Sequence, residues 1–402
     1  MSLVRILIAL VAFALVLVPG SSAWNQAAAQ ETNKQPAPDP PKLRAAAWAL
    51  VDANTGLYLA GKNPDERLPI ASTTKIMLAL LAFKDRANLN QEVAVTKQAE
   101  RFVGFTYSNI GLNQGERLSI RELLEAALIP SGTEAAYTLA QHLGGGSAGR
   151  FVKEMNQEAH SLGLKNTHFE NPVGLDARGH YSSARDLATI ARAAMKYPTF
   201  DNIVDTEQTT ISTQNRNIEV STTNNLLYIY APANGVKTGT SPKAGPCLVA
   251  SATKDGESYI AVVLDAAGEQ YRFEAARTAL QYGFNNYEHR ALARKGQVYK
   301  KLTLPFRRDE SVKLVAAKDV TGLVGPGLKA ERRVTAKKAP PAAKAGQELG
   351  TVEVFVNGKS VGSSPLVTKK GYEEASLWQK IRYWSAGAAQ RVSGWVSGLV
   401  PS

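Results

Sequence analysis

The chain has 402 residues, of which 44% are hydrophobic and 20% are charged. This composition excludes a largely disordered chain and predicts a globular protein of two or three domains. The formal net charge of +12 allows contact with anionic lipids or wall polymers, although a solvated basic surface without a partner explains it equally well.

The N-terminus has the pattern of a secretory signal peptide. Arg5 precedes a wholly apolar run over residues 6–18, and small residues that suit cleavage follow, at Ala23 and at Ala29. The run is short for a membrane span, which makes an uncleaved anchor the weaker alternative. We therefore expect residues 1–29 to direct export. No nucleic-acid partner is expected, because no module that binds nucleic acid is recognisable.

The residues after the signal predict an α+β fold. Residues 30–42 are polar and rich in proline, which indicates an extended leader. Two strands are expected from Ala45 onward, joined through a turn at residues 52–56. A helical block follows, and from about residue 209 the chain changes to strands and one last helix. This order lacks the regular alternation of a parallel sheet.

At residues 71–80 the chain reads ASTTKIMLAL, with Ser72 and Lys75 three residues apart at the head of an apolar run. Serine is a good N-cap, so this stretch alone favours the capped start of a buried helix. In a helix, however, Lys75 would lie one turn from Ser72 on the same face. Its amine could then take the proton of the hydroxyl, which a serine nucleophile requires.

Two further motifs favour the catalytic interpretation. A helix with a capping box, Ser119 and Glu122, is ended by Pro130, and SGT follows at residues 131–133. KTGT occupies residues 237–240, just before a strand. S-x-x-K, S-x-polar and K-T-G in this order are typical of serine β-lactamases and penicillin-binding enzymes.

The residues around these motifs resemble a known family. The stretches DANTGLYL, PIASTTKIM, NPVGLD, SSARDLA, GVKTGTSPKAGPCLVASA and LQYGF are similar to the low-molecular-weight penicillin-binding proteins, the D-alanyl-D-alanine carboxypeptidases of peptidase family S11. The resemblance covers residues 44–284 and, more weakly, the rest of the chain. It implies helices around an antiparallel sheet, then an all-β domain and often a membrane anchor. It also implies a peptidoglycan stem ending in D-Ala-D-Ala as substrate and acylation by β-lactam antibiotics. No cofactor and no metal are expected.

The residue types suit peptide cleavage through a serine. Ser72 is the expected nucleophile, Lys75 its general base, and Ser131 a proton relay to the leaving amine. Lys237 adds a second positive charge, which disfavours protonation of Lys75 and can orient a substrate carboxylate.

The substrate is expected to bind along the third motif. Thr238 and Gly239 leave a strand edge on which a D-Ala-D-Ala tail can add as an extra strand. The resemblance implies an oxyanion hole from the backbone N–H groups of Ser72 and Thr240. It also implies that Arg272 lies near the terminal carboxylate of the substrate.

Thr133 departs from the family pattern, which usually has asparagine at this place. Threonine offers one hydroxyl and less reach than an amide, so the expected grip on the substrate amide is weaker. A scaffold protein that has lost catalysis therefore stays an alternative. A β-lactamase is another, although its deacylating glutamate would have to be Glu158 or Glu170, which stand in no recognisable motif.

The domain limits follow from these patterns. We predict a catalytic domain over residues 43–286 and a small β domain over residues 287–369, in which residues 339–346 are either a linker or a loop. Residues 370–402 are predicted to form an amphipathic helix on the extracytoplasmic membrane surface. The alternative is a helix packed on its own β domain. In both cases the apolar stripe of the predicted helix consists of Leu377, Ile381, Trp384, Ala388, Val392, Trp395 and Leu399.

Overall fold

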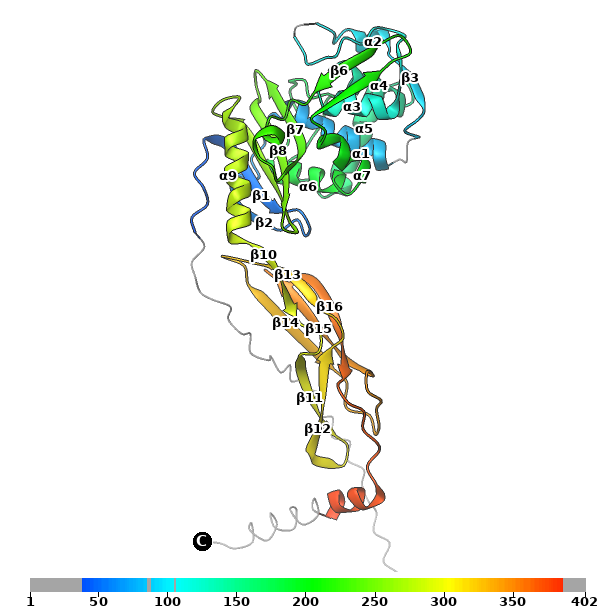
Figure 1. The fold of residues 1–402 in the computed structure, drawn as a ribbon, viewed down its shortest axis with the longest axis vertical. Coiled ribbons are helices and arrows are strands. Elements are labelled where there is room, and N and C mark those ends of the chain that lie inside the picture. The colour runs from blue at the N-terminus through cyan, green and yellow to red at the C-terminus, as the bar shows by residue number, and fades with distance from the viewer. Residues whose placement is uncertain (1–37, 85–87, 105, 386–402) are drawn as a thin grey trace, which may run out of the picture. The chain divides into compact units, whose positions relative to one another are not determined.

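The structure is a computed structural model that describes residues 38–84, 88–104 and 106–385 (Figure 1). The predicted signal peptide and most of the leader lie outside the described residues. The described chain divides into two compact units, of which the larger comprises residues 38–291 and Thr321–Lys329. The smaller comprises Leu292–Val320 and residues 330–385. The sequence-based domain limits stay predictions.

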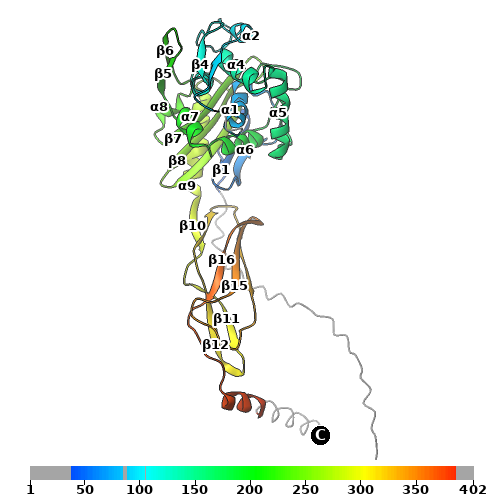
Figure 2. The same cartoon turned by 90° about the vertical axis from the view of Figure 1, so that its right-hand side faces the viewer.

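An antiparallel five-stranded sheet with the order β2-β1-β9-β8-β7 forms the centre of the larger unit. Its strands are β1 (Ala45–Asp52), β2 (Tyr58–Lys62), β7 (Ala233–Ser241), β8 (Gly245–Lys254) and β9 (Glu257–Ala266). Helix α9 (Tyr271–Asn286) covers one face, and the helical block covers the other (Figures 1 and 2). The predicted strand pair and its turn at residues 52–56 are confirmed.

Both faces of the sheet are buried, which explains the continuous apolar runs in its strands. In β1, Ala47 and Ala49 face the helical block, whereas Trp48 and Leu50 pack in the core beneath α9. This alternation is the two-residue period of a strand. Alternate side chains of the strand therefore pack into two separate hydrophobic cores, one on each face of the sheet.

The helical block surrounds α1 (Lys75–Lys84), whose residues 75–83 are all buried. Helices α3, α4, α5 and α6 pack against α1. Besides α1, the block consists of the 3-10 turn η1 (Ala71–Thr74), α2 (Lys97–Glu100), α3 (Ile120–Leu128), α4 (Thr133–Leu143), α5 (Ala148–Ser161), α6 (Ala184–Ala194) and α7 (Pro198–Val204). The short helix α8 (Leu226–Ile229) packs instead in the core beneath α9. Two hairpins accompany the block, β3 (Glu92–Ala94) with β4 (Arg117–Ser119) and β5 (Gln208–Ser212) with β6 (Asn217–Ser221). The capping box predicted for Ser119 and Glu122 is present at the start of α3.

The smaller unit contains a second antiparallel sheet, with the order β11-β12-β16-β15-β14. Residues 337–347 join β14 to β15, so the proline-bearing segment 339–346 is a loop of this sheet and not a linker. The strands are β11 (Val298–Leu304), β12 (Arg307–Ala316), β14 (Ala330–Ala336), β15 (Glu348–Val356) and β16 (Lys359–Thr368). Strands β10 (Glu288–Ala293) and β13 (Val320–Val324) form a separate two-stranded sheet, most of whose residues belong to the larger unit.

The last described element is a helix that begins at Leu377 and continues to residue 385. Ser376 caps its start, because Gln379 N donates to Ser376 Oγ (3.3 Å) and Gln379 Oε1 accepts from Ser376 N (2.8 Å). The predicted stripe positions 388, 392, 395 and 399 lie outside the described residues. Within the described ranges, no helix is both long and apolar enough to cross a bilayer.

Candidate active site

The first motif lies where η1 leads into α1. Ser72 is half-buried in η1, and Lys75 is the first residue of α1. Lys75 Nζ donates to Ser72 Oγ at 2.8 Å, whereas the turn has no side-chain cap. The interpretation of Ser72 as a helix N-cap is therefore wrong. The residue before it, Ala71, has a φ of +45°, a left-handed conformation that is unfavourable for alanine and often found at functional sites.

The second motif meets the same amine from the loop between α3 and α4. Lys75 Nζ lies 3.2 Å from the carbonyl oxygen of Ser131 and 3.4 Å from its Oγ. Ser131 also has a left-handed backbone, with a φ of +68°. The structure therefore brings two hydroxyls, those of Ser72 and Ser131, to one buried amine.

The environment of Lys75 changes its basicity. The side chain is fully buried, and this burial lowers the pKa of Lys75 to about 7, although the charge of Glu134 opposes the shift. A lysine with such a pKa is partly neutral near neutral pH, so it can accept a proton.

Lys237 of the third motif is buried on β7 beside these groups. Its Nζ donates to the carbonyl oxygen of Thr238 at 3.2 Å. Burial lowers the pKa of Lys237 well below the usual lysine range, and the charges of Lys75 and Arg272 lower it further. Two buried lysines at close quarters therefore resist being protonated together.

Gly239 is the point of closest approach between β7 and the serine. A Cβ at this position would lie 2.9 Å from Ile70 O and 3.1 Å from Ser72 N, so a side chain here would collide with backbone. Gly174, in the NPVGLD stretch, packs against the same turn. Its Cβ would lie 2.0 Å from Ala71 O and 2.9 Å from Ser72 N. The sequence alone indicates no role for Gly174.

One side chain, Asn171, fixes the backbone conformation of the loop that contains Gly174. Asn171 Oδ1 accepts from the backbone N–H groups of Val173, Gly174 and Leu175. The next residue, Asp176, ties the loop to the end of β7, because its carboxylate accepts from Ser241 Oγ at 2.6 Å.

The end of the third motif is held by α9. Arg272 is buried and donates to Gly239 O at 3.3 Å and to Thr240 Oγ1 at 2.8 Å. Thr240 is exposed, and its hydroxyl donates to Glu269 Oε1 at 2.9 Å. Glu269 also pairs with Arg272 at 2.8 Å. The structure thus brings Arg272 to the third motif, together with a glutamate that the sequence had not singled out.

Two threonines of the motifs are oriented by neighbouring loops. Thr238 Oγ1 lies 2.5 Å from Thr223 Oγ1. Thr133 is buried at the first position of α4, and its backbone N–H donates to Ser108 O at 2.8 Å. The residue that departs from the family pattern therefore lies just after Ser131, at the edge of the site.

The glutamates considered for a β-lactamase lie in other surroundings. Glu158 of α5 pairs with Lys84, which is nine residues beyond Lys75 and hence about 14 Å further along α1. Glu170 is close to the ring of His168, at 3.4 Å.

His180 has a structural place beneath the motif. It accepts from Glu170 N at Nδ1 (3.1 Å) and contacts Thr74 Oγ1 through Nε2 (2.9 Å). Burial lowers the pKa of His180 to about 4, so the ring is neutral at physiological pH and holds η1 without adding charge.

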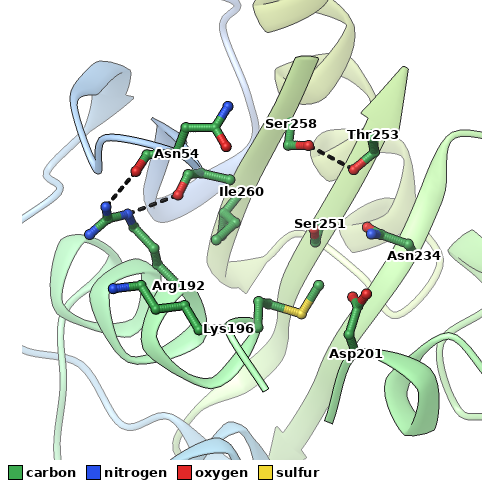
Figure 3. A pocket seen from close by; sticks show the side chains of 11 residues that line it. Asn54, Arg192, Lys196, Asp201, Asn234, Ser251, Thr253, Ser258 and Ile260 are labelled. Carbon is green, nitrogen blue, oxygen red and sulfur yellow. Dashed lines mark hydrogen bonds between the residues drawn. The ribbon is translucent and has the colours of Figure 1, made fainter. Parts of the chain in front are cut away.

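A separate pocket of about 240 Å³ lies between the β1–β2 turn, helices α6 and α7, and strands β7 to β9 (Figure 3). None of the motif residues lines it. Arg192 donates from Nε to Ala53 O (2.8 Å) and from Nη2 to Asn54 O (2.5 Å), which fixes the turn to α6. The arginine satisfies backbone carbonyls there and has a structural function.

Comparison with known proteins finds one matching family model for each of the two units. Residues 32–268 match the family model of peptidase S11, described as D-alanyl-D-alanine carboxypeptidase. Residues 287–374 match the model of the C-terminal domain of penicillin-binding protein 5.

Individual relatives match over most of the chain. D-alanyl-D-alanine carboxypeptidase DacF of Bacillus subtilis is 33% identical over 338 residues, 82% of this chain and 86% of the relative. The crystal structure of penicillin-binding protein 5 from Haemophilus influenzae is 30% identical. It covers 84% of this chain and 99% of its own, with a TM-score of 0.65. The Streptomyces K15 DD-transpeptidase structure, 36% identical with a TM-score of 0.59, covers 61% of this chain and 99% of its own.

Proposed function

The chain belongs to the D-alanyl-D-alanine carboxypeptidases of peptidase family S11, and on this premise we propose that it works through an acyl-enzyme on Ser72. The predicted α+β fold with an all-β second domain is confirmed, as is the carboxypeptidase function. The assignment of single residues to steps is our proposal. The substrate of the enzyme is the terminal D-Ala-D-Ala of a peptidoglycan pentapeptide stem, and penicillins acylate the same serine, Ser72.

Acylation begins at the serine–lysine pair. Neutral Lys75 takes the proton of Ser72 Oγ, and the oxygen attacks the carbonyl carbon between the two D-alanines. The backbone N–H groups of Ser72 and Thr240 stabilise the resulting oxyanion. As the intermediate collapses, Lys75 returns the proton through Ser131 to the amine of the leaving D-alanine. A water molecule then hydrolyses the ester of the acyl-enzyme and releases the trimmed stem. The proton of the water returns to Ser72 Oγ through the same groups in reverse order.

The cationic side of the site selects the substrate terminus. Lys237 and Arg272 attract the C-terminal carboxylate, and the Thr240 hydroxyl can bind it. The edge of β7 at Thr238 and Gly239 receives the peptide backbone as an added strand. Thr133 lies where the family asparagine would hold the substrate amide.

The observation that carries this proposal is the contact of Lys75 Nζ with Ser72 Oγ at 2.8 Å, made by a lysine whose pKa burial lowers to about 7. The step requires no metal or cofactor, so a chelator should leave the rate of D-alanine release unchanged.

Labelling with a fluorescent penicillin, followed by mass spectrometry of the modified peptide, tests the nucleophile. We expect the label on Ser72, its loss in Ser72→Ala at unchanged melting temperature, and its retention in the control Ser161→Ala on α5. A label on Ser131, or one that survives Ser72→Ala, would contradict the assignment. A long-lived acyl-enzyme and release of D-alanine from a pentapeptide also separate this function from a β-lactamase and from an inactive scaffold.

We also propose that the protein is exported by residues 1–29 and held at the extracytoplasmic membrane surface by residues 370–402. The support is the signal pattern together with exposed apolar side chains on the described part of the last helix. Leu377, Trp378 and Trp384 are 72%, 80% and 61% exposed. Such a placement keeps the active site near wall precursors.

A further inference from the structure

Glu134 is a fully buried glutamate in the first turn of α4, three residues after Ser131. Its Oε1 accepts from the backbone N–H groups of Ile110 (2.7 Å) and Leu112 (3.4 Å). Its Oε2 is also buried, and no described residue hydrogen-bonds to it. A buried carboxylate is expensive unless a cation or further donors compensate it, so this side chain requires an explanation.

Lys75 is the cation whose charge acts electrostatically on Glu134. Helix α1, which carries Lys75, packs against α4, and the lysine amine contacts Ser131 just before that helix. Burial raises the pKa of Glu134, whereas the hydrogen bonds from backbone N–H groups, Ile110 first, lower it, and the charge of Lys75 lowers it further. Glu134 in turn raises the pKa of Lys75 against the effect of burial.

The other charged groups around Lys75 do not duplicate this interaction. Lys237 on β7 is a cation, and Arg272 on α9 is paired with Glu269. The acidic side chains of the other helices on α1 are held elsewhere: Glu158 of α5 by Lys84, Asp186 of α6 by Thr167, and Glu122 of α3 by Ser119. Glu125 of α3 is half-buried, with Arg121 and Glu122 as its charged neighbours.

We propose that Glu134 is a positioning residue of the serine–lysine pair, which provides the counter-charge for the Lys75 amine and anchors the segment 108–112 beside the site. This inference rests on the proposed function of Lys75 as the base. The segment is anchored at both ends of its contact with α4, because Ser108 O accepts from Thr133 N while Ile110 donates to Glu134. One side chain thus links the backbone beside the second motif to the charge balance of the first.

The proposal predicts a change in the pH profile. Without the negative charge, the pKa of Lys75 falls further, so the lysine loses its proton at lower pH but becomes a weaker base. In Glu134→Gln the acidic limb of the acylation rate should move to lower pH. The plateau should fall by less than about tenfold, far below the 10²–10⁴-fold loss that removal of a general base causes. Glu134→Asp keeps the charge and should move the limb back towards that of the wild type.

The measurement is the rate of labelling by a fluorescent penicillin between pH 5 and pH 9, a range of about two units either side of the Lys75 pKa. The matched control is Glu125→Gln, which removes another carboxyl whose pKa burial raises, on α3. It should leave the limb in place. Amide hydrogen exchange at Ile110 separates anchoring from charge: Glu134→Gln keeps the acceptor oxygen and the protection, and Glu134→Ala loses both.

A reciprocal measurement does not depend on the Glu134 variants folding. In Lys75→Ala, loss of the cation should shift the pH midpoint of the Ile110 amide resonance, which reports Glu134, to higher pH. An unmoved limb in Glu134→Gln with intact Ile110 protection, or an unmoved midpoint in Lys75→Ala, would overturn the inference and leave the proposed function standing. If Lys75→Ala retained the wild-type acylation rate, the proposed function would fail and the inference with it.

Discussion

The two units of the chain differ in what they bury. The larger unit buries Lys75, Lys237 and Glu134 around the serine motif. Among the described residues of the smaller unit, the buried polar side chains are Ser364 and Thr368, and neither is charged. Burial of an ionisable group costs stability, and it is retained mainly where a shifted pKa has a use. The difference supports the proposal that the reaction takes place in the larger unit.

The largest expected effect comes from removing the buried cations. Lys75→Ala and Lys237→Ala should each lower kcat/KM for D-alanine release by roughly 10²–10⁴, as losses within one catalytic unit do. The exposed Lys196→Ala is the control and should leave the rate unchanged. A loss below tenfold in Lys75→Ala would show that burial of this lysine serves packing and not proton transfer. The buried charges of the larger unit would then no longer indicate where the reaction takes place.

The same lysine fixes the direction of the pH dependence. Lys75 must be neutral to accept the serine proton, and its pKa is lowered to about 7. The acylation rate of the wild type should therefore rise as the pH increases through about 7 and then level off. A rate that falls over this interval in stopped-flow labelling would contradict Lys75 as the base.

A smaller effect is expected at Thr133, where the larger unit departs from its family. Thr133→Asn places an amide at the buried first position of α4, with both a donor and an acceptor for the substrate. We expect carboxypeptidase turnover to rise several-fold at unchanged penicillin labelling of Ser72. A large drop in turnover would show that the pocket is built around threonine.

The sequence predicted the elements that depend on local signals. Such elements are the capping box at Ser119, the strand pair after Ala45 and the helix before Pro130. They are predictable because caps, turns and proline act over a few residues. The three motifs were placed together by their order and by family resemblance. No local signal could have shown that the first two motifs meet at the amine of Lys75, with the buried Lys237 of the third motif nearby.

Contacts between distant segments were missed for the same reason. The electrostatic effect of Glu134 on Lys75 depends on the packing of α1 against α4. The hydrogen bond from Thr240 to Glu269 depends on the segment just before α9 lying beside the end of β7. The fit of Gly174 against Ala71 joins residues about a hundred positions apart. Helical periodicity and propensity carry no information on such encounters, which only the tertiary packing defines.

The smallest effect on catalysis, and the largest on location, is expected at the end of the smaller unit. Deletion of residues 377–402 should leave D-alanine release in solution unchanged, because no group proposed for the reaction lies there. The deletion should nevertheless move the protein from the membrane fraction to the soluble fraction, provided that cleavage of the signal peptide is confirmed.

The described part of the last helix has features of both interpretations of this segment, a helix docked on the smaller unit and a helix on the membrane surface. Tyr383 and Trp384 pack near Phe306, with ring centroids 5.7 Å and 6.5 Å apart, which favours docking on the smaller unit. Trp378, in contrast, is 80% exposed, an arrangement that suits insertion into a lipid interface.

A single substitution therefore sharpens the comparison. Trp378→Glu places a charge on the exposed side and should weaken sedimentation with anionic lipid vesicles, while Tyr228→Glu, at a 47% exposed aromatic of the larger unit, should not. If both variants sediment like the wild type, the helix is a docked part of the smaller unit. The exposed aromatics would then have no role in holding the active site at the membrane.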